Sequence, residues 1–184
     1  MRVVIGITGA SGSIYAVSVI KSLIDMGVEV HGVISEMGER VLMHECSMKK
    51  EEISEGVIWH QNDNLFAAIA SGSYKIDAMA VVPCSMNTLA KIATGGGDGL
   101  LLRAASVCIK ERRRLVIVPR EMPLSIIYIE RMLEAAKAGA VILPACPGFY
   151  HDPRTMGDLI NHVAGKILDL LNVENNMFRR WGDE

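Results

Sequence analysis

The sequence is poor in aromatic residues and has no excess of positive charge. Phe, Trp and Tyr make up 5% of the 184 residues, and the formal net charge is −2. A nucleic-acid-binding surface normally shows a basic stripe or aromatic side chains on which bases stack. The one dense basic patch, Lys110–Arg114, is interpreted as the solvent-exposed C-terminus of a helix, where cations complement the helix dipole, and the role of Lys110 stays open. We therefore expect no nucleic-acid partner.

Long hydrophobic runs are absent as well. No apolar run approaches the roughly 18 residues that a membrane-spanning helix needs, and the first residues form an apolar strand pattern without a charged leader. We therefore expect a cytoplasmic protein with no membrane span. Half of the residues are nevertheless hydrophobic and the mean hydropathy is +0.27, which is high for a monomer. We interpret this surplus as surface for contacts between the subunits of a homo-oligomer.

Metal-binding patterns are missing too. The four cysteines, at positions 46, 84, 108 and 146, include no C-x-x-C pair, and His44 and His151 are poor partners for the nearest of them. Such cysteines are expected to be free thiols. There is also no Asp-Asp-x-x-Asp cluster, which would signal a magnesium-bound diphosphate. We expect no metal, so a phosphorylated substrate would have to be held by Lys, Arg and hydroxyl groups.

Short apolar runs alternate with helical patterns along the chain. The runs cover residues 3–7, 28–34, 77–82, 115–118 and 140–143, and helices are predicted at 13–26, 36–46, 63–70, 86–93, 98–111, 124–138 and 155–171. Near-continuous apolar strands that alternate with helices predict one α/β domain, a parallel sheet with helices on both faces. We expect this domain over residues 1–171, with a polar surface excursion at 48–62 and a flexible loop at 94–99. Residues 172–184 then form a C-terminal tail that docks on a neighbouring subunit.

The first strand run is followed by the glycine-rich segment Gly6-Ile-Thr-Gly-Ala-Ser-Gly12. Backbone N–H groups at such a strand-to-helix turn can bind phosphate, although a tight turn with a helix cap would explain the same residues. The segment is not the dinucleotide fingerprint G-x-G-x-x-G. A short-chain dehydrogenase is excluded because Tyr128 has Met132, not lysine, four places on. A nucleotide or flavin contact is the interpretation that remains.

Three later strand runs also end in candidate site residues. In Pro83–Thr88, two interpretations of Ser85 stay open: a helix cap alone, or, with Thr88, one of two hydroxyls for a phosphate. Cys84 lacks a histidine to activate it. In Pro119–Pro123, Arg120 and Glu121 are either an ion pair or a carboxylate tuned for proton transfer. In Pro147–His151, Tyr150 is predicted to face the pocket from a lid, with Phe149 packed in the core.

Several blocks, in this order, resemble the UbiX-type flavin prenyltransferases over essentially the whole chain. The matching blocks are Ile7–Gly12, Ala70–Ser73, Pro83–Ser85, Arg103–Ala105, Lys110–Arg113, Val118–Glu121, Gly139–Ile142, Pro147–His151 and Arg180–Gly182. The resemblance implies a three-layer Rossmann-like, flavodoxin-like sheet that binds FMN. It also implies that a dimethylallyl phosphate alkylates reduced FMN at N5 and C6, without a metal. The prenylated FMN would serve a UbiD-type decarboxylase, and such proteins commonly form dodecamers.

The resemblance also implies roles for single residues. Ser11 and Glu45 would lie near flavin N5, and Glu121 would handle a proton. FMN would be held by Gly9, Ala10, Ser11, Ser35, Ser85, Thr88, Arg103 and Arg120. The prenyl phosphate would be held by Lys110, Arg120, Tyr150 and Lys166, next to Glu121. Lys166 departs from the arginine usual at this position, and Asn64 replaces an aromatic residue found in some members.

Two other functions stay open. An FMN-dependent oxidative decarboxylase of the cysteine type shares the fold and a stretch like Pro83–Thr88, but it relies on an early catalytic histidine and leaves Lys110 and Glu121 unexplained. A non-catalytic flavin-binding subunit of an aromatic-acid decarboxylase would need the FMN site alone. The variants Lys110→Ala and Glu121→Gln separate these alternatives from a prenyltransferase. If the chain is a prenyltransferase, both variants should lose prenyl transfer but still bind FMN.

Overall fold

The apolar strand runs assemble into one parallel sheet. In this computed structural model, which describes residues 1–182, the strand order is β3-β2-β1-β4-β5-β6. The strands are β1 (Arg2–Ile7), β2 (Glu29–Ile34), β3 (Val57–His60), β4 (Ala78–Cys84), β5 (Arg114–Pro119) and β6 (Val141–Ile142). All neighbouring strands pair in parallel, with register pairs such as Val3↔Val30 and Val3↔Ala78. This is the order of a doubly wound Rossmann-like sheet, as the sequence predicts.

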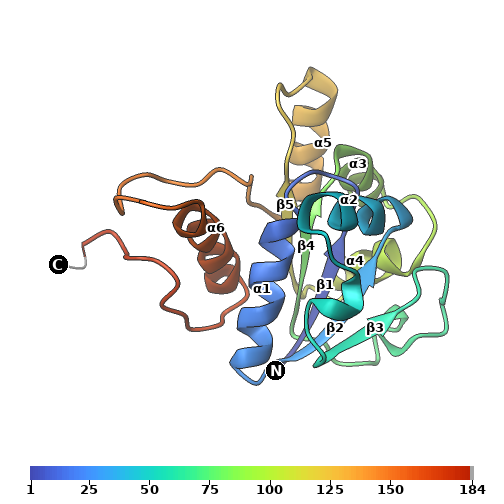
Figure 1. Ribbon diagram of the computed structural model, residues 1–184. Helices are drawn as coiled ribbons and strands as arrows, with labels where there is room; N and C mark the ends of the chain where they lie inside the picture. Colours follow the sequence, from blue (N-terminus) through green and yellow to red (C-terminus); the bar gives the residue numbers. More distant parts are fainter. Residues whose placement is uncertain (183–184) are drawn as a thin grey trace.

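Within residues 1–182, six α-helices cover the two faces of the sheet. They are α1 (Ser13–Asp25), α2 (Glu36–Cys46), α3 (Met86–Thr94), α4 (Leu100–Lys110), α5 (Ile126–Lys137) and α6 (Met156–Leu170), with 3₁₀ turns at Lys50–Glu52 and Ala68–Ala70. Apolar residues of α1, α2 and α6 pack on one face, and those of α3, α4 and α5 on the other. Figure 1 shows α1 between α6 and the sheet. The three layers of the expected fold are confirmed.

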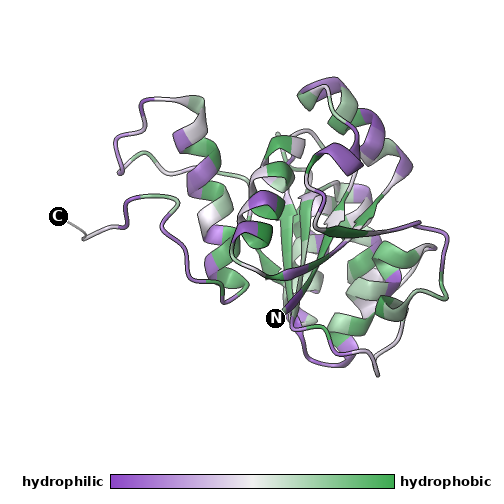
Figure 2. Ribbon diagram, turned by 60° about the horizontal axis from the view of Figure 1, so that its bottom comes forward, coloured by the Kyte–Doolittle hydropathy of each residue, from purple (hydrophilic) through white to green (hydrophobic). Residues whose placement is uncertain are grey.

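The strands are hydrophobic because both faces of the sheet are covered. Residues Val3–Ile7 of β1 and all seven residues of β4 are buried. In Figure 2 the central strands are coloured as hydrophobic, whereas the helices carry hydrophilic residues on their outer sides. Among the described helices, four begin at a hydroxyl cap, of which only Ser85 was predicted from the sequence. The caps are Ser35, Ser85, Ser125 and Thr155.

The predictions for residues 48–70 are wrong in two places. Residues 57–60 of the predicted surface excursion form the edge strand β3, and the predicted helix at 63–70 is a turn followed by the 3₁₀ segment Ala68–Ala70. The side-chain oxygen of Asn64 accepts a hydrogen bond from the N–H of Phe66 at 3.1 Å. Such a local bond competes with a helix, and Phe66 is consequently fully exposed.

The basic patch 110–114 is more ordered than a solvated helix end. Arg113 donates to the carbonyl groups of Gly72 and Tyr74. Arg114 donates to the carbonyl group of Leu170 and to the side chain of Asn172. These arginines therefore tie neighbouring loops to the start of β5.

The described part of the C-terminal tail, residues 172–182, packs on α6 of its own chain. Arg180 makes two hydrogen bonds to the carboxylate of Asp169, at 2.8 and 2.9 Å, and Asn175 donates to the same carboxylate. The predicted docking of this tail on another subunit stays a prediction, and residues 183 and 184 of the tail lie outside the described residues. Within residues 1–182, no helix is long and apolar enough to span a membrane.

Candidate active site

The strand order reverses between β1 and β4, and ligands of such sheets bind in the crevice at this point. Thr8 joins the two loops that leave these strands. Its hydroxyl donates to the carbonyl group of Pro83 at 2.8 Å and accepts from the N–H of Ser85 at 2.7 Å. Thr8 is buried, so this link fixes the loop after β4 against the loop after β1.

A cavity of about 450 Å³, which we name the switch-point hollow, lies at this reversal. It is lined by Thr8, Gly9, Ser35, Glu36, Met37, Asn62, Ser85, Asn87, Thr88, Lys91, Asp98, Leu101 and Leu102. Two helices, α2 and α3, begin at its wall, and helix N-termini attract anions through their free N–H groups.

The hydroxyl groups of the hollow are arranged around these two helix starts. Ser35 accepts from the N–H of Gly38 at 3.1 Å. Ser85 accepts from the N–H of Thr88 and donates to the Thr88 hydroxyl at 3.0 Å, which leaves the Thr88 hydrogen available. A side chain in place of the hydrogen of Gly9 would collide with Met37. Hydroxyl donors, helix N-termini and a glycine suit the phosphate and ribityl chain of a flavin mononucleotide.

A second group lies at the N-terminus of α1. The carboxylate of Glu45, on α2, accepts from the N–H groups of Gly12 and Ser13, both at 2.9 Å, and from the Ser11 hydroxyl. Partial burial opposes the ionisation of Glu45, but these hydrogen bonds and the charge of Arg120 together lower its pKa. Arg120 also donates to the carbonyl group of Ser11 at 3.2 Å. The structure thus brings Ser11, Glu45 and Arg120 together.

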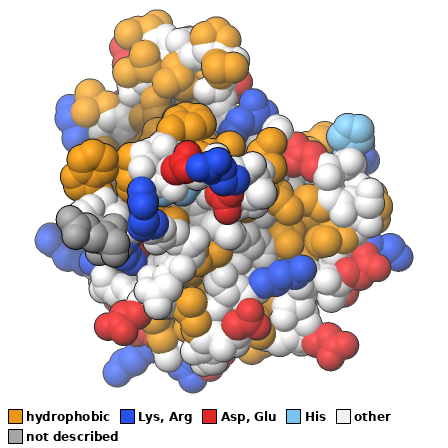
Figure 3. Space-filling model, turned by 60° about the vertical axis from the view of Figure 1, so that its left-hand side comes forward, with side chains coloured by type: hydrophobic (Ala, Val, Ile, Leu, Met, Phe, Trp, Pro, Cys, Tyr) orange, Lys and Arg blue, Asp and Glu red, His pale blue; other side chains and the backbone are white. Residues whose placement is uncertain are grey.

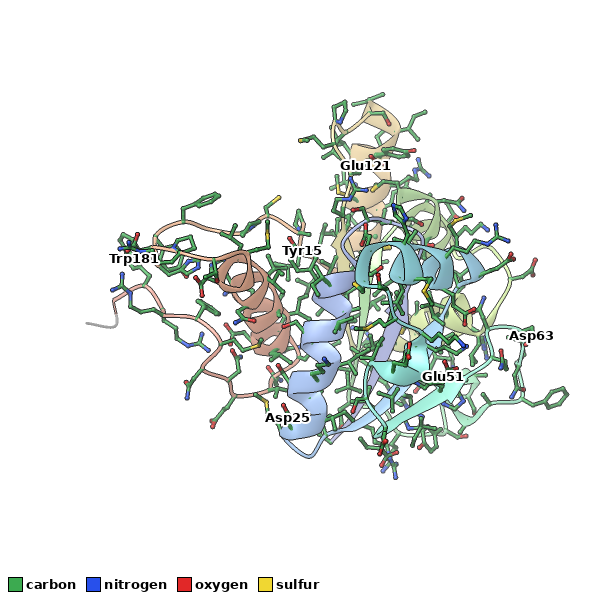
Figure 4. The ribbon with its side chains drawn as sticks, in the orientation of Figure 1. Tyr15, Asp25, Glu51, Asp63, Glu121 and Trp181 are labelled. Atoms are coloured by element: carbon green, nitrogen blue, oxygen red, sulfur yellow. The ribbon has the colours of Figure 1, made fainter. Side chains whose placement is uncertain are left out.

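Glu121 lies beyond the end of β5, in the exposed turn that leads to α5. Its carboxylate accepts from the N–H of Met122 at 3.2 Å. Figure 4 shows Glu121 at the top of the molecule, beside the base of α5. Arg103, in contrast, lies beside the hollow rather than in it. Its guanidinium donates to the carbonyl group of Ala70 at 2.9 Å and lines a smaller cavity of about 210 Å³ under the glycine loop 95–99.

Lys110 is far from the hollow within one chain. It is the last residue of α4, whose first residues Leu101 and Leu102 line the hollow, and an 11-residue helix is about 16 Å long. Its ammonium group pairs with Glu111 at 2.6 Å, near Gly72. Lys110 therefore lies at the edge of the sheet where the strands begin, opposite the edge at which Ser85, Thr88 and Arg120 lie.

Tyr150 and Lys166 form a separate group over α6. The ring of Tyr150 packs edge-on against Trp181, with ring centres 5.5 Å apart, and Figure 4 shows Trp181 beyond α6, on the side away from the sheet. The ammonium group of Lys166 lies 3.7 Å from Asp169. Phe149, predicted in the core, is exposed. The Tyr150 hydroxyl lies 3.3 Å from Nε2 of His162, a buried residue of α6.

Comparison with known proteins identifies the family. The Flavoprotein family model matches residues 1–167. The chain is 42% identical to the flavin prenyltransferase UbiX of Methanocaldococcus jannaschii, over 99% of both chains. It is 47% identical to the UbiX of Halalkalibacterium halodurans, over 98% of this chain and 93% of the relative. The chain belongs to the UbiX family of flavoproteins.

Solved structures of UbiX proteins superpose closely on this one. A crystal structure of AnUbiX in complex with FMN and dimethylallyl pyrophosphate matches with a TM-score of 0.94 and 41% identity, over 98% of this chain and 97% of that chain. A dodecameric FMN-dependent UbiX-like decarboxylase from Escherichia coli matches with a TM-score of 0.95 and 40% identity, over 98% and 99% of the two chains. The peptidyl-cysteine decarboxylase EpiD, at 18% identity and a TM-score of 0.64, shares the fold alone.

Reasoning from the sequence missed several residues of the site. Asn62 lines the hollow and accepts, through its carbonyl and side-chain oxygens, from the N–H groups of Leu100 and Leu101, so it caps α4. Recognition of β3 would have placed Asn62 at a strand end. Lys91 also lines the hollow, one helical turn after Thr88. Thr8 stands within the glycine-rich segment 6–12 but was given no role of its own. His162 gave no sequence signal, because a lone His in an apolar segment is usually a packing residue.

Cysteine and metal chemistry have little support in the described residues. The four cysteines are free, and burial raises the pKa of the Cys84 thiol far above its usual value. Burial likewise raises the pKa of Cys108, to about 12. A thiol with a raised pKa is a poor nucleophile at neutral pH. Among residues 1–182, no three His, Cys, Asp or Glu side chains are grouped closely enough to hold a metal ion.

Proposed function

We propose that this chain is a flavin prenyltransferase. It transfers the dimethylallyl group of a dimethylallyl phosphate to reduced FMN, forms bonds to N5 and C6, and releases the phosphate. The observation that carries the proposal is the polar group Ser11, Glu45 and Arg120, positioned beside a hollow that suits FMN, in a chain 42–47% identical to UbiX enzymes over nearly its full length.

In this proposal the switch-point hollow holds FMN. Ser85 and Thr88 bind its phosphate at the N-terminus of α3, and Ser35 contacts it from the start of α2. Gly9, Ala10 and Ser11 let the flavin approach the backbone of the loop after β1, while Arg120 and Arg103 flank it. The reduced flavin supplies the electron-rich nitrogen and carbon that attack the allyl group. Glu45, whose pKa is lowered, stays ionised near N5 and accepts hydrogen bonds.

The prenyl donor is held by cationic and hydroxyl groups. Cleavage of the allylic C–O bond leaves the electron pair, and hence negative charge, on the phosphate, which Arg120, Lys110, Lys166 and Tyr150 stabilise. Fixed donors aimed at a developing anion are among the largest contributions to catalysis. The second bond joins C6 to the tertiary carbon of the allyl group and consumes the remaining C=C bond, so the neighbouring allyl carbon gains a proton as C6 loses one. Glu121 moves this proton.

Assembly is part of this proposal. Lys110 lies at the opposite sheet edge of its own chain, so it serves the site of a neighbouring copy. A dodecameric relative supports a homo-oligomer, and we propose the same number of subunits here. We also propose that the product is delivered to a UbiD-type decarboxylase. The expected cytoplasmic location stays a prediction.

The test is anaerobic incubation of the protein with reduced FMN and a prenyl donor, followed by mass spectrometry of the released flavin. Dimethylallyl monophosphate and diphosphate are supplied in separate arms. We expect a flavin that carries one added dimethylallyl unit in at least one arm, and none with Glu121→Gln, which should still bind FMN. Unmodified flavin in both arms, or carbon dioxide released from a phenylacrylic acid by this chain alone, would contradict the proposal.

A further inference from the structure

A buried histidine, His162, contacts Tyr150, the predicted phosphate ligand. His162, on α6, is 8% exposed. Its ring is stacked on that of His151, with centres 4.9 Å apart, and meets the rings of Phe178 and Tyr150 edge-on at 4.8 and 5.5 Å. Gly165, one turn along the helix, leaves room for Phe178, because a Cβ there would lie 2.6 Å from its ring. His162 is thus held on three sides.

Both ring nitrogens of His162 have a partner. The N–H of Gly148 donates to Nδ1 at 3.2 Å, so Nδ1 must carry a lone pair. In a neutral imidazole the hydrogen then sits on Nε2, which lies 3.3 Å from the Tyr150 hydroxyl oxygen. Burial, followed by the nearby charges of His151 and Lys166, lowers the pKa of His162 and favours this neutral form.

The direction of this hydrogen bond determines what Tyr150 can do. A phenol whose oxygen accepts from Nε2–H must direct its own hydrogen elsewhere, towards an acceptor. A phosphate oxygen is such an acceptor, whereas a phenol that donated to the histidine would present only lone pairs, which repel a phosphate. The tautomer of His162 therefore sets whether Tyr150 can bind an anion.

We propose that His162 is a positioning residue for Tyr150, holding the phenol so that its hydroxyl hydrogen points at the phosphate of the prenyl donor. This inference rests on the proposed function, since it takes the phosphate as the partner of Tyr150. Pure packing among the rings of Tyr150, His151 and Phe178 would need the shape of His162 but not its Nε2 hydrogen.

Three substitutions separate the hydrogen bond from the packing. His162→Gln can place an amide N–H near the position of Nε2, His162→Asn is too short to reach Tyr150, and His162→Phe keeps the ring alone. We expect Asn and Phe to raise the KM for the prenyl phosphate about threefold to tenfold, the usual worth of one hydrogen bond, with unchanged FMN affinity. In the His162→Gln variant, the KM should return most of the way to the wild-type value. Should Phe not fold, the comparison of Gln with Asn decides alone.

A double-mutant cycle with Tyr150→Phe supplies the deciding readout. Without the phenol hydroxyl, His162→Asn should cost nothing further in KM. An equal cost in both backgrounds, or equal impairment by Gln and Asn, overturns the positioning role. If Tyr150→Phe itself has no effect on KM, the inference fails while prenyl transfer by the wild type still upholds the proposed function.

The tautomer can be tested without any activity measurement. Nitrogen NMR of the histidine side chains, assigned by comparison with His162→Gln, should show a neutral ring protonated on Nε2 at neutral pH. A ring protonated on Nδ1, or charged, would overturn the inference and would leave the proposed function untouched.

Discussion

At the scale of single residues, two helices beside the site take their N-terminal caps from distant side chains. α1 and α4 begin at Gly12 and Gly99, which have no side chain to cap a helix. Glu45 supplies the cap of α1, and Asn62 that of α4. Since free N–H groups at helix starts need a partner, these two residues link local helix stability to the shape of the site.

We predict that Glu45→Gln lowers the free energy of unfolding by about 1 kcal/mol at neutral pH, because the neutral amide loses the charge-assisted hydrogen bonds to Gly12 and Ser13 and the attraction to the helix dipole. The pKa of Glu45 is lowered in the folded state. The stabilisation is therefore complete above about pH 4.5, the value for an unpaired carboxyl group, and is lost as the pH falls through the folded pKa. Denaturant unfolding at a series of pH values measures it, with exposed Glu55→Gln as the control. A constant difference down to pH 3 would contradict this account.

A second residue-scale prediction concerns the Thr8 link. Thr8→Val keeps the shape but removes the acceptor of the Ser85 N–H, and an unpaired buried donor costs about 1–3 kcal/mol. We expect lower stability in thermal unfolding and weaker FMN binding in a fluorescence titration, because the loop that carries Ser85 is released. Thr8→Ser, which retains the hydroxyl, is the matched control. Equal behaviour of Val and Ser would show that the link is dispensable.

At the scale of elements, the sequence predicts the long elements well and the short ones poorly. The strands β1, β2, β4 and β5 are near-continuous apolar runs, so burial on both faces is visible in the sequence. The edge strand β3 has only four residues, of which Ile58 is exposed, and carries no such signal. Around residue 64 the apolar spacing suits a helix, but the Asn64 side chain binds the Phe66 N–H instead.

The candidate site shows the same limit. Ser35, Ser85 and Thr88 were predictable because they follow buried strands and start helices, and strand ends converge at the switch point. The contacts that hold the site together were not predictable. Those of Thr8 with Pro83 and of Glu45 with Gly12 join residues 75 and 33 positions apart. Such contacts depend on tertiary packing, and only the known family relates Glu45 to the flavin.

The prediction at the scale of α6 concerns how Lys166 binds the prenyl phosphate. Lys166 has a single ammonium group, 3.7 Å from Asp169, which is already bound by Arg180. We predict that Lys166→Arg lowers the KM for the prenyl phosphate about threefold, because a guanidinium binds phosphate with two parallel hydrogen bonds. Steady-state kinetics at saturating reduced FMN measure it. A raised KM would mean instead that the new arginine pairs with Asp169 in competition with Arg180.

At the scale of the whole molecule, one chain does not bring its predicted site residues together. Glu121 lies at the sheet edge where the strands end, whereas Lys110 lies at the edge where they begin. Several side chains of the Met122–Leu133 region are exposed and apolar. Those most exposed are Met122, Ile126, Ile127 and Leu133. Figure 3 shows hydrophobic side chains gathered over this end of the molecule. A second copy of the chain can dock on this exposed apolar helix beside Glu121 and place its own residues in the site.

This arrangement predicts complementation between two inactive variants. Lys110→Ala and Glu121→Gln should each abolish prenyl transfer while retaining FMN binding, and Lys21→Ala, an exposed lysine of α1, should remain active. In oligomers assembled from equal amounts of the two inactive chains, random mixing leaves about a quarter of the sites with both residues intact if they come from different subunits. Mass spectrometry of the flavin product should then recover about that share of the wild-type activity. If Lys110 and Glu121 served the same chain's site, every mixed site would lack one of them and no activity would return.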